Sequence, residues 1–353
     1  MPAGSMDSPC SGEDWQLVEA ARTGFPTYSS QNEEGKFIDI QGLAGRSKVR
    51  SGEIPPQTGR LAVVTGATGG LGYELARLLA QSCADVILAG RDEAKGREAA
   101  RRIRALAPNA LVRFEKLDLA RLSSIATFAG KLRAQGLPVD ILVNNAGVMA
   151  LPDRQLTVDG FEMQLGTNYL GHFALTALLL PLLKASRKRR VVQMSSLAHR
   201  IGQIRFDDLH GKSNYRPWAA YSQSKLAALL FARELQRQSD LHGWRLVSTA
   251  VHPGLARTNL VTNGPGPRSL TAWLSRPLGR ALGQSAENGA QPAVFAATSD
   301  DVRPGGFYGP AGMLELTGPP MPARVARHAL QEDVARRLWQ VSEQLTGVRW
   351  PVE

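Results

Sequence analysis

The chain has 353 residues, of which 43% are hydrophobic, and its 42 Lys and Arg against 31 Asp and Glu give a formal net charge of +11. The hydrophobic fraction is ample for a buried core, while the two cysteines, Cys10 and Cys83, are too few for a disulfide framework or a cysteine zinc site, so a reducing compartment such as the cytoplasm is expected. The first residues are polar, and the longest apolar run, at 173–183, is too short to cross a bilayer, so we expect no integral membrane segment.

The positive charge is densest in KASRKRR, at 184–190, which raises the question of a nucleic-acid or membrane-surface partner. The other basic residues are scattered and form no stripe with interleaved aromatic residues, and the cluster lies between a predicted helix and a predicted strand. A solvated turn is the favoured interpretation, and we expect no nucleic-acid partner. The alternative is a protein that binds anionic lipid or nucleic acid through this cluster and the N-terminal residues, with an affinity that falls as salt rises.

Residues 1–58 are rich in Gly, Ser, Gln and charged residues and show no sustained hydrophobic period. They are predicted to form a flexible polar extension, followed by a single folded domain at 59–353. From Leu61 onward the pattern changes, because short apolar runs begin to alternate with stretches of helical period such as Leu71, Leu75, Leu78 and Leu79.

Nearly continuous apolar strands that alternate with helices are typical of a parallel sheet covered on both faces. The predicted fold class is therefore α/β, a single doubly wound Rossmann domain with a mostly parallel sheet flanked by helices on both faces. The strands are expected at LAVVTG (61–66), DVILAG (85–90), LVRFEKLD (111–118), VDILVNNAG (139–147), RVVQMSS (190–196) and WRLVSTAVHPG (244–254). In such a fold, ligands bind beyond the carboxyl ends of the strands.

The first predicted strand leads into a glycine-rich loop, TGATGGLG at 65–72, which opens the next helix. Gly66 would permit a tight turn, Gly70 would let the backbone approach a pyrophosphate at the helix N-terminus, and Gly72 would allow close packing of helix on strand. We therefore expect a dinucleotide site whose loop residues are Gly66, Thr68, Gly70, Leu71 and Gly72.

The end of the second predicted strand indicates which dinucleotide binds. In NAD binders an acid about 20 residues beyond the loop receives the ribose hydroxyls. This strand instead ends at Gly90 and is followed by Arg91, whose guanidinium can grip a 2′-phosphate with two hydrogen bonds. Asp92 is better explained as the N-cap of the next helix, so the predicted cofactor is NADP(H).

Further along, AAYSQSKLAAL at 219–229 places the phenol of Tyr221 and the ammonium of Lys225 one helical turn apart. A free tyrosine has a pKa of about 10, and a cation on the same helical face would favour the phenolate and lower that pKa. The pair could be a tuned acid, or a packed aromatic residue beside a surface charge. The motifs elsewhere in the chain favour the tuned acid.

Together these motifs resemble the short-chain dehydrogenase/reductase family over residues 60 to about 350. TGATGGLG fits the family pattern TGxxxGxG, and NNAG at 144–147 fits its fourth-strand motif. The resemblance implies a catalytic tetrad of Asn168, Ser196, Tyr221 and Lys225. It also implies cofactor contacts, beyond the glycine loop and Arg91, from Asp118, Leu119, Asn144, Ala146, Gly147, Tyr221, Lys225, Pro253, Gly254 and Thr258.

The tetrad, as the family arranges it, would work by proton transfer. Tyr221 would give or take the substrate proton, and Ser196 would orient the carbonyl and stabilise its developing negative charge. Lys225 would lower the pKa of Tyr221 and bind the nicotinamide ribose, and Asn168 would hold a water that links the pair with solvent. Ser195 faces the opposite side of its predicted strand and is expected to be structural.

Within the family the likeness is to the retinol dehydrogenase-like branch, which includes the oxidoreductase domain of the WW-domain proteins. It rests on NYLGHFALT, SSLAHRIGQIRFDDL, AYSQSKLAALLF and LWQVSEQLTG. An apolar N-terminal anchor found in membrane-bound members is not seen, and 1–58 matches no part of the branch, so localisation and substrate are not carried over. Family members often pair through the helices that contain GHFALT and YSQSK, which allows a homodimer.

The segments 197–218 and 259–284 are expected to wall the substrate pocket, and their aromatic residues include Phe206, Tyr215, Trp218 and Trp273. They favour a lipophilic small-molecule carbonyl or alcohol as substrate, although they could also serve only to pin long loops. The predicted function is an NADP(H)-dependent oxidoreductase, with a catalytically silent NADP(H)-binding sensor or scaffold as the alternative. No metal site is expected, because the histidines lack metal-ligand spacing; those considered are His172, His199, His210 and His252.

Overall fold

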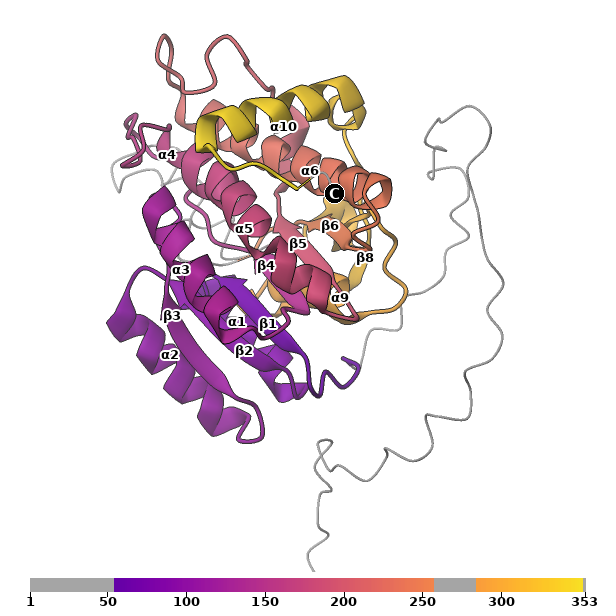
Figure 1. Ribbon diagram of the computed structural model, residues 1–353. Coiled ribbons are helices and arrows are strands. Elements are labelled where there is room, and N and C mark those ends of the chain that lie inside the picture. Colours follow the sequence, from indigo (N-terminus) through magenta and orange to yellow (C-terminus); the bar gives the residue numbers. More distant parts are fainter. Residues whose placement is uncertain (1–53, 257–283, 352–353) are drawn as a thin grey trace, which may run out of the picture.

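The computed structural model describes residues 54–256 and 284–351, whose centre is an eight-stranded sheet with helices against it (Figure 1). The strands are β1 (Leu61–Thr65), β2 (Asp85–Gly90), β3 (Val112–Lys116), β4 (Ile141–Asn144), β5 (Arg190–Met194), β6 (Val247–Val251), β7 (Phe307–Pro310) and β8 (Pro320–Pro322). The long helices are α1 (Gly70–Gln81), α2 (Glu93–Leu106), α3 (Leu122–Gln135), α5 (Gly171–Ala185), α6 (Pro217–Leu241), α9 (Ala286–Thr298) and α10 (Glu332–Thr346).

The strands are ordered β3-β2-β1-β4-β5-β6-β7-β8, and neighbours from β3 to β7 run parallel, whereas β8 pairs antiparallel with β7. Strand β1 lies between β2 and β4. In chain order, β2 and β3 are therefore added on one side of β1, and β4 to β8 are added on the other side. The predicted doubly wound, mostly parallel fold is confirmed. The order reverses between β1 and β4, and in folds of this type the ligand crevice lies beyond the carboxyl ends of the strands at that point.

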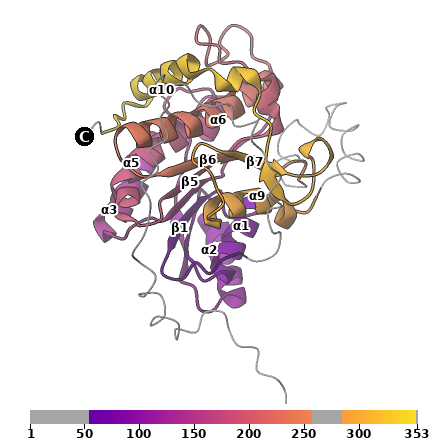
Figure 2. The same cartoon turned by 90° about the vertical axis from the view of Figure 1, so that its right-hand side faces the viewer.

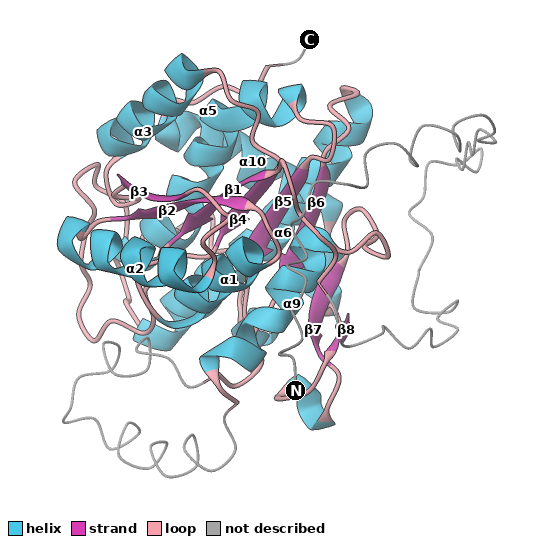
Figure 3. Cartoon of the chain, turned by 90° about the horizontal axis from the view of Figure 1, so that it is seen from below, coloured by secondary structure: helices cyan, strands magenta, loops and turns pink. Residues whose placement is uncertain are grey.

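The two faces of the sheet have separate cores, because successive strand residues point to opposite faces. Val63 and Ile87 pack with α3, α5, α6 and α10, whereas Val64 and Leu88 pack with α1, α2 and α9. The two helical layers lie on opposite sides of the strands (Figure 2, Figure 3). A strand covered on both faces has no exposed side that would select polar residues, which explains the continuous apolar runs.

Helix α6 is buried along most of its length, because it lies between the sheet and α10 (Figure 2). It begins with Pro217 in its first turn, where a missing N–H costs nothing, and every residue from 221 to 230 is buried. Trp339 of α10 packs against both Phe173 of α5 and Phe231 of α6, with ring centres 5.1 and 5.8 Å apart. Helix α10 therefore covers part of the apolar surface of α6 within one chain.

All six predicted strands occur, and β2 has the predicted bounds. The other five are shorter than predicted, because residues at one or both ends of each predicted strand belong to loops. Strands β7 and β8 are not predicted from the sequence, since FYGP and PMP are short and contain Gly or Pro, which are uncommon in strands. Within the described ranges, no helix has the length and apolar character needed to cross a membrane.

Candidate active site

The glycine loop follows β1 and leads into α1, as the sequence predicts. Gly66 and Gly70 have φ values of +66° and +56°, in the left-handed region that favours glycine. A Cβ atom on Gly66 would lie 2.9 Å from Cα of Ala146, and one on Gly72 would lie 2.4 Å from the carbonyl oxygen of Gly66. The loop therefore packs against itself and against the turn after β4 too closely for side chains at these positions.

Thr65, the last residue of β1, ties these two turns together. Its hydroxyl oxygen accepts the N–H groups of Asn145 and Ala146 at 2.9 and 3.0 Å and lies 2.9 Å from Nε2 of His172. Nδ1 of His172 lies 3.1 Å from the carbonyl oxygen of Asn168, which can only accept, so Nδ1 carries the proton and Nε2 accepts from Thr65. Burial lowers the pKa of His172 to about 3, so the ring is neutral. Neither Thr65 nor His172 is predicted from the sequence, although each lies in or near a motif.

Arg91 and Asp92 follow β2 and differ in their contacts. The side chain of Arg91 is exposed and makes no hydrogen bond or ion pair with another described residue. Oδ1 of Asp92 accepts the backbone N–H of Lys95 at 3.0 Å, so Asp92 is the N-cap of α2, as predicted. The carboxylate is thus committed to the helix, whereas the guanidinium is available to a ligand.

Four further residues predicted to bind the cofactor lie near the ends of β1, β2 and β3. A Cβ atom on Gly90 would lie 3.0 Å from Cγ2 of Thr68, so Thr68 borders the end of β2. Leu71 packs partly against the core on the α1 side of the sheet, and Leu119 is buried in the opposite core. Oδ1 of Asp118 accepts the N–H of Ala120 at 3.0 Å. Thr68, Leu71 and Asp118 keep partly exposed side chains, whereas the side chain of Leu119 belongs to the core.

The two asparagines of NNAG serve the fold through their side chains. Nδ2 of Asn144 donates to Oγ1 of Thr176 at 2.9 Å, and Nδ2 of Asn145 donates to the carbonyl oxygen of Thr65 at 2.8 Å. Gly147 lies beside two residues of the predicted tetrad, because a Cβ atom on it would lie 3.0 Å from Oδ1 of Asn168 and 3.5 Å from Nζ of Lys225. The structure thus brings the fourth-strand motif and two residues of the predicted tetrad together.

Tyr221 and Lys225 lie one turn apart on α6 and are only 5% and 3% exposed. Nζ of Lys225 donates to the carbonyl oxygen of Met194, at the end of β5, at 2.9 Å. It also lies 5.7 Å from the centre of the Tyr221 ring. Lys225 is therefore not a surface charge, and the pair forms a buried acid and cation beside the sheet.

The pKa values of this pair differ from the expectation. Burial raises the pKa of Tyr221 to about 12, against an opposing effect of the Ser196 side chain, and burial lowers the pKa of Lys225 to about 8. Desolvation penalises the phenolate and the ammonium alike. The expected fall in the pKa of Tyr221 does not occur in the structure described, and Lys225 is not among the causes that act on this pKa; the phenol keeps its proton at neutral pH.

Asn168 lies in a π-helical segment, Gly166–Leu170, that leads into α5. Its Oδ1 accepts the N–H of Val148 at 2.8 Å, and its Nδ2 donates to the carbonyl oxygen of Val148 and to Oγ of Ser224, each at 2.9 Å. π-helical turns are rare and often occur at functional sites. The side chain fixes the turn beside Lys225 and keeps no free N–H for the water that the family resemblance implies.

Ser196 follows β5 and caps the short 3₁₀ helix Leu197–Ile201 by accepting the N–H of Ala198 at 3.2 Å. Its hydroxyl is close enough to Tyr221 to influence that phenol. Oγ of Ser195 donates to the carbonyl oxygen of Lys225 at 2.8 Å, in keeping with the structural role expected for it. The end of β5 therefore holds both the candidate serine and the anchor of the α6 turn that carries the lysine.

Pro253 and Gly254 follow β6, and Gly254 has a φ of +61°. A Cβ atom on Gly254 would lie 2.3 Å from the carbonyl oxygen of Leu316, so this turn is pressed against the loop after β7. Thr258 and Trp273, the remaining residues predicted near the nicotinamide and the substrate, lie outside the described residues.

A family model described as short chain dehydrogenase matches residues 60–265, which contain the glycine loop and the four residues of the predicted tetrad. The chain belongs to the short chain dehydrogenase family. It is 43% identical to polyprenol dehydrogenase of Mus musculus over 86% of this chain and 88% of that protein. It is also 43% identical to retinol dehydrogenase 13 of Homo sapiens over 83% of this chain and 86% of that protein.

Among solved structures, an uncharacterized protein from Mycobacterium paratuberculosis is 42% identical, with a TM-score of 0.69 over 85% of this chain and 97% of that one. The relatives confirm the retinol dehydrogenase-like branch. As a short chain dehydrogenase, the protein is an oxidoreductase of alcohol and carbonyl groups that uses a nicotinamide cofactor.

The aromatic residues of 197–218 play different parts in this short chain dehydrogenase. The ring of Phe206 lies under the guanidinium of Arg337 at 4.1 Å, and the hydroxyl of Tyr215 donates to a main-chain carbonyl of the loop after β4 at 2.9 Å. Both residues pin the segment to the domain. Trp218 is 48% exposed, and its ring meets the ring of Tyr221 edge-on at 5.9 Å. Only Trp218 of these three lies beside the candidate catalytic tyrosine with a large exposed surface.

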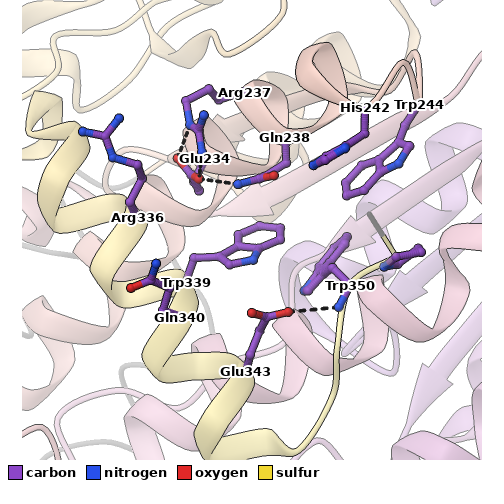
Figure 4. Close-up of a pocket in the computed structure, with 11 residues that line it drawn as sticks. Glu234, Arg237, Gln238, His242, Trp244, Arg336, Trp339, Gln340, Glu343 and Trp350 are labelled. Carbon is purple, nitrogen blue, oxygen red and sulfur yellow. Dashed lines mark hydrogen bonds and ion pairs between the residues drawn. The ribbon is translucent and has the colours of Figure 1, made fainter. Parts of the chain in front are cut away.

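A pocket of about 230 Å³ lies elsewhere in this short chain dehydrogenase, between the end of α6, α10 and the last described residues (Figure 4). Trp244, Trp339 and Trp350 form much of its lining, and Glu343 accepts the N–H of Trp350 at 3.0 Å. No described member of the predicted tetrad or cofactor site lines this pocket. In the part of the chain that the structure describes, no group of three or more His, Cys, Asp or Glu could hold a metal ion.

Proposed function

We propose that this short chain dehydrogenase is an NADP(H)-dependent oxidoreductase that interconverts a carbonyl and an alcohol on a lipophilic small molecule, with Tyr221 as the acid and base. The observation that carries the proposal is the buried pair of Tyr221 and Lys225 beside Ser196, at the carboxyl end of β5. A phenol that holds its proton, a nearby ammonium and a hydroxyl can together deliver a proton to a carbonyl oxygen and stabilise the charge that develops on it.

The residues around the glycine loop fit a dinucleotide. The N-cap of α1 is Gly69, which offers no side chain to the first N–H groups of the helix, so these groups are free to donate hydrogen bonds to a pyrophosphate. The glycines of the loop have no side chains, so a ligand can approach the backbone at the same place. When bound there, the nicotinamide supplies or accepts the hydride of the reaction.

The chain's own groups have distinct tasks in the reductive direction. Tyr221 is protonated at neutral pH, because its pKa is raised to about 12, so it can donate to the carbonyl oxygen as hydride arrives. Ser196 donates a second hydrogen bond to that oxygen. Lys225, with a pKa lowered to about 8, is still mostly charged at neutral pH, and its positive charge stabilises the negative charge on the phenolate that remains. In the oxidative direction Tyr221 takes the alcohol proton instead.

Two observations support the finer points of the proposal. Arg91 has an exposed side chain beyond β2, where a 2′-phosphate would extend from the adenosine ribose, and Asp92 is occupied as a helix cap. Trp218 offers an apolar surface next to Tyr221, and the names of the relatives, polyprenol dehydrogenase and retinol dehydrogenase, belong to enzymes of long apolar alcohols. These features favour NADP(H) and a lipophilic substrate.

The proposal is tested by NADPH consumption with a panel of lipophilic aldehydes, ketones and quinones. The variant Tyr221→Phe should lose turnover by roughly 10² to 10⁴ fold while it still binds NADPH, because only the proton donor is removed. Tyr73→Phe is the matched control, since Tyr73 lies in α1 with its ring under Arg102, and it should retain the parent's rate.

Turnover that persists in Tyr221→Phe would contradict the role given to this phenol. Tight NADPH binding without turnover of any compound would instead favour the silent sensor or scaffold.

A further inference from the structure

A carboxylate outside the predicted tetrad lies between two of the loops that form the site. Glu315 belongs to a short 3₁₀ helix, Met313–Glu315, in the connection between β7 and β8. Met313 and Leu314 beside it are exposed, whereas the Glu315 side chain is only 14% exposed and points to the domain. Leu314 and Glu315 both have positive φ values, of 55° and 59°, which non-glycine residues seldom adopt. Contacts of the Glu315 side chain therefore help to hold the loop in this conformation.

The Glu315 carboxylate accepts hydrogen bonds from three separate segments. Nη2 of Arg200, in the 3₁₀ helix after Ser196, donates to Oε2 at 2.7 Å. Nε2 of His252, which follows β6, lies 3.1 Å from the same oxygen. The backbone N–H of Arg324, after β8, donates to Oε1 at 3.2 Å. A negative charge with these donors is well stabilised, and the pKa of Glu315 is lowered by them despite the opposing effect of burial.

The link to the turn after β6 runs through a histidine of defined tautomer. Nδ1 of His252 accepts the backbone N–H of Gly254 at 3.2 Å, so Nε2 carries the proton and donates to Glu315. The imidazole is fully buried and thereby connects the carboxylate with the Pro253–Gly254 turn. A second contact reinforces this link, because the N–H of Leu255 donates to the carbonyl oxygen of Leu316 at 2.9 Å.

The link to Ser196 runs through the 3₁₀ helix that begins at this serine. Ser196 is the N-cap of Leu197–Ile201, and Nδ1 of His199 lies 2.7 Å from the Ser196 carbonyl oxygen. Arg200 is the next residue, so its ion pair with Glu315 restrains the helix that starts at Ser196. The Glu315 carboxylate thus bonds both to Arg200, four positions after Ser196, and to His252, two positions before Gly254.

We propose that Glu315 is a positioning residue that fixes the Ser196 loop relative to the Pro253–Gly254 turn. The proposal rests on the proposed function, in which Ser196 contacts the substrate oxygen, and on the cofactor contact that the family resemblance implies for Pro253 and Gly254. Glu315 touches neither reactant, but it sets the separation of the two protein segments that hold them. Arg200 transmits this restraint to the serine, and His252 transmits it to the cofactor turn.

The experiment compares Glu315→Ala, Arg200→Ala and the double variant by two measurements, kcat and the dissociation constant of NADPH from fluorescence titration. Arg200→Ala should lower kcat roughly tenfold with an NADPH dissociation constant within about twofold of the parent's, because only the serine side is released. Glu315→Ala should lower kcat by a similar factor and also raise the NADPH dissociation constant about fivefold or more, because both sides are released. The double variant should be no slower than Glu315→Ala alone, since the two residues act through one contact.

Two further variants separate positioning from stability. Glu315→Gln keeps a carbonyl oxygen that can accept from Arg200 and His252, and it should bring the NADPH dissociation constant back to within about twofold of the parent's. Glu343→Ala is the matched control, because Glu343 is also a mostly buried carboxylate, 16% exposed. It bonds to the C-terminal segment, at a place remote from the candidate site. This variant should lower the melting temperature without changing kcat or NADPH affinity. If Glu315→Ala does not fold, Glu315→Gln and Arg200→Ala still test the proposal.

The proposal is overturned if Glu315→Ala folds and leaves both quantities within twofold of the parent's, or if Glu343→Ala changes them equally. It is also overturned if the losses in kcat of the two single variants multiply in the double variant. A parent protein that turns over no compound would refute the proposed function, but not this inference. The NADPH titrations alone then decide it, because weaker binding by Glu315→Ala and not by Arg200→Ala supports it, and unchanged binding refutes it.

Discussion

Arg91 and Asp92 are neighbours in sequence, yet one is free toward solvent and the other is bonded into α2. If Arg91 grips the 2′-phosphate, Arg91→Ala should weaken NADPH binding by roughly ten- to a hundredfold, because a charge-assisted hydrogen bond contributes about 1.5 to 3 kcal/mol. NADH, which lacks that phosphate, should bind with nearly unchanged affinity. Titration of both cofactors against the parent and the variant measures the change in preference.

Asp92→Ala provides the control for this experiment. Loss of the N-cap should lower the melting temperature, with no change in the ratio of the NADPH and NADH dissociation constants. If Asp92→Ala alters the ratio of the NADPH and NADH dissociation constants and Arg91→Ala does not, the Asp92 carboxylate and not the Arg91 guanidinium distinguishes the two cofactors.

At the scale of the residue, the sequence predicts the side chains that lie within short motifs and misses those whose partners are distant. Tyr221 and Lys225 can be predicted because helical spacing places them together. Glu315 cannot, since Arg200 lies 115 positions earlier in the chain and no local pattern marks either one. The sequence predicts a lowered pKa for Tyr221, whereas burial raises it, because helical spacing shows a nearby cation but not how deeply the phenol is buried.

Trp339 is a buried residue of α10 that packs against rings from other parts of the domain. Trp339 packs against Phe173, Phe231 and Trp350, with ring centres 4.5 to 5.8 Å apart. Trp339→Ala should therefore lower the free energy of unfolding by roughly 3 to 5 kcal/mol, as expected for deletion of a large buried aromatic side chain. Urea unfolding followed by circular dichroism measures the loss. A cost below about 1 kcal/mol would mean that α10 is held to α6 by other contacts.

At the scale of the element, strands with continuous apolar runs are predicted well and strands without them are not. LAVVT and DVILAG are recognisable because both faces of the sheet are covered. The PMP segment forms strand β8 by pairing with β7, and this tertiary contact is not marked by any local pattern. The π-helical turn at Asn168 is likewise not marked by a local pattern, and the Asn168 side chain bonds to Val148, which lies 20 positions earlier in the chain.

The stability of the whole molecule should depend on pH through two buried histidines. Burial lowers the pKa of His172 to about 3 and that of His199 to about 4, whereas an unfolded histidine has a pKa of about 6.5. Between pH 6.5 and 4 the unfolded chain therefore binds more protons than the folded one, so the free energy of unfolding should fall as the pH is lowered through this window. Denaturant unfolding at a series of pH values measures the slope.

His199→Gln should reduce that slope, because one of the two groups that must charge on unfolding is removed. A parent protein whose free energy of unfolding is the same at pH 6.5 and pH 5 would contradict the assignment of these rings as neutral and buried.

The two ends of the sheet differ from its middle in a way that affects association between molecules. At one end, β8 is three residues long and two of them are prolines, Pro320 and Pro322, which have no N–H to offer to a further strand. At the other end, β3 carries Arg113, Glu115 and Lys116, and Glu115 pairs with a lysine of α3. Charged and proline-rich edge strands resist the pairing that would let one sheet continue into another. The domain is thus protected at both edges from the strand-by-strand addition through which sheet proteins aggregate.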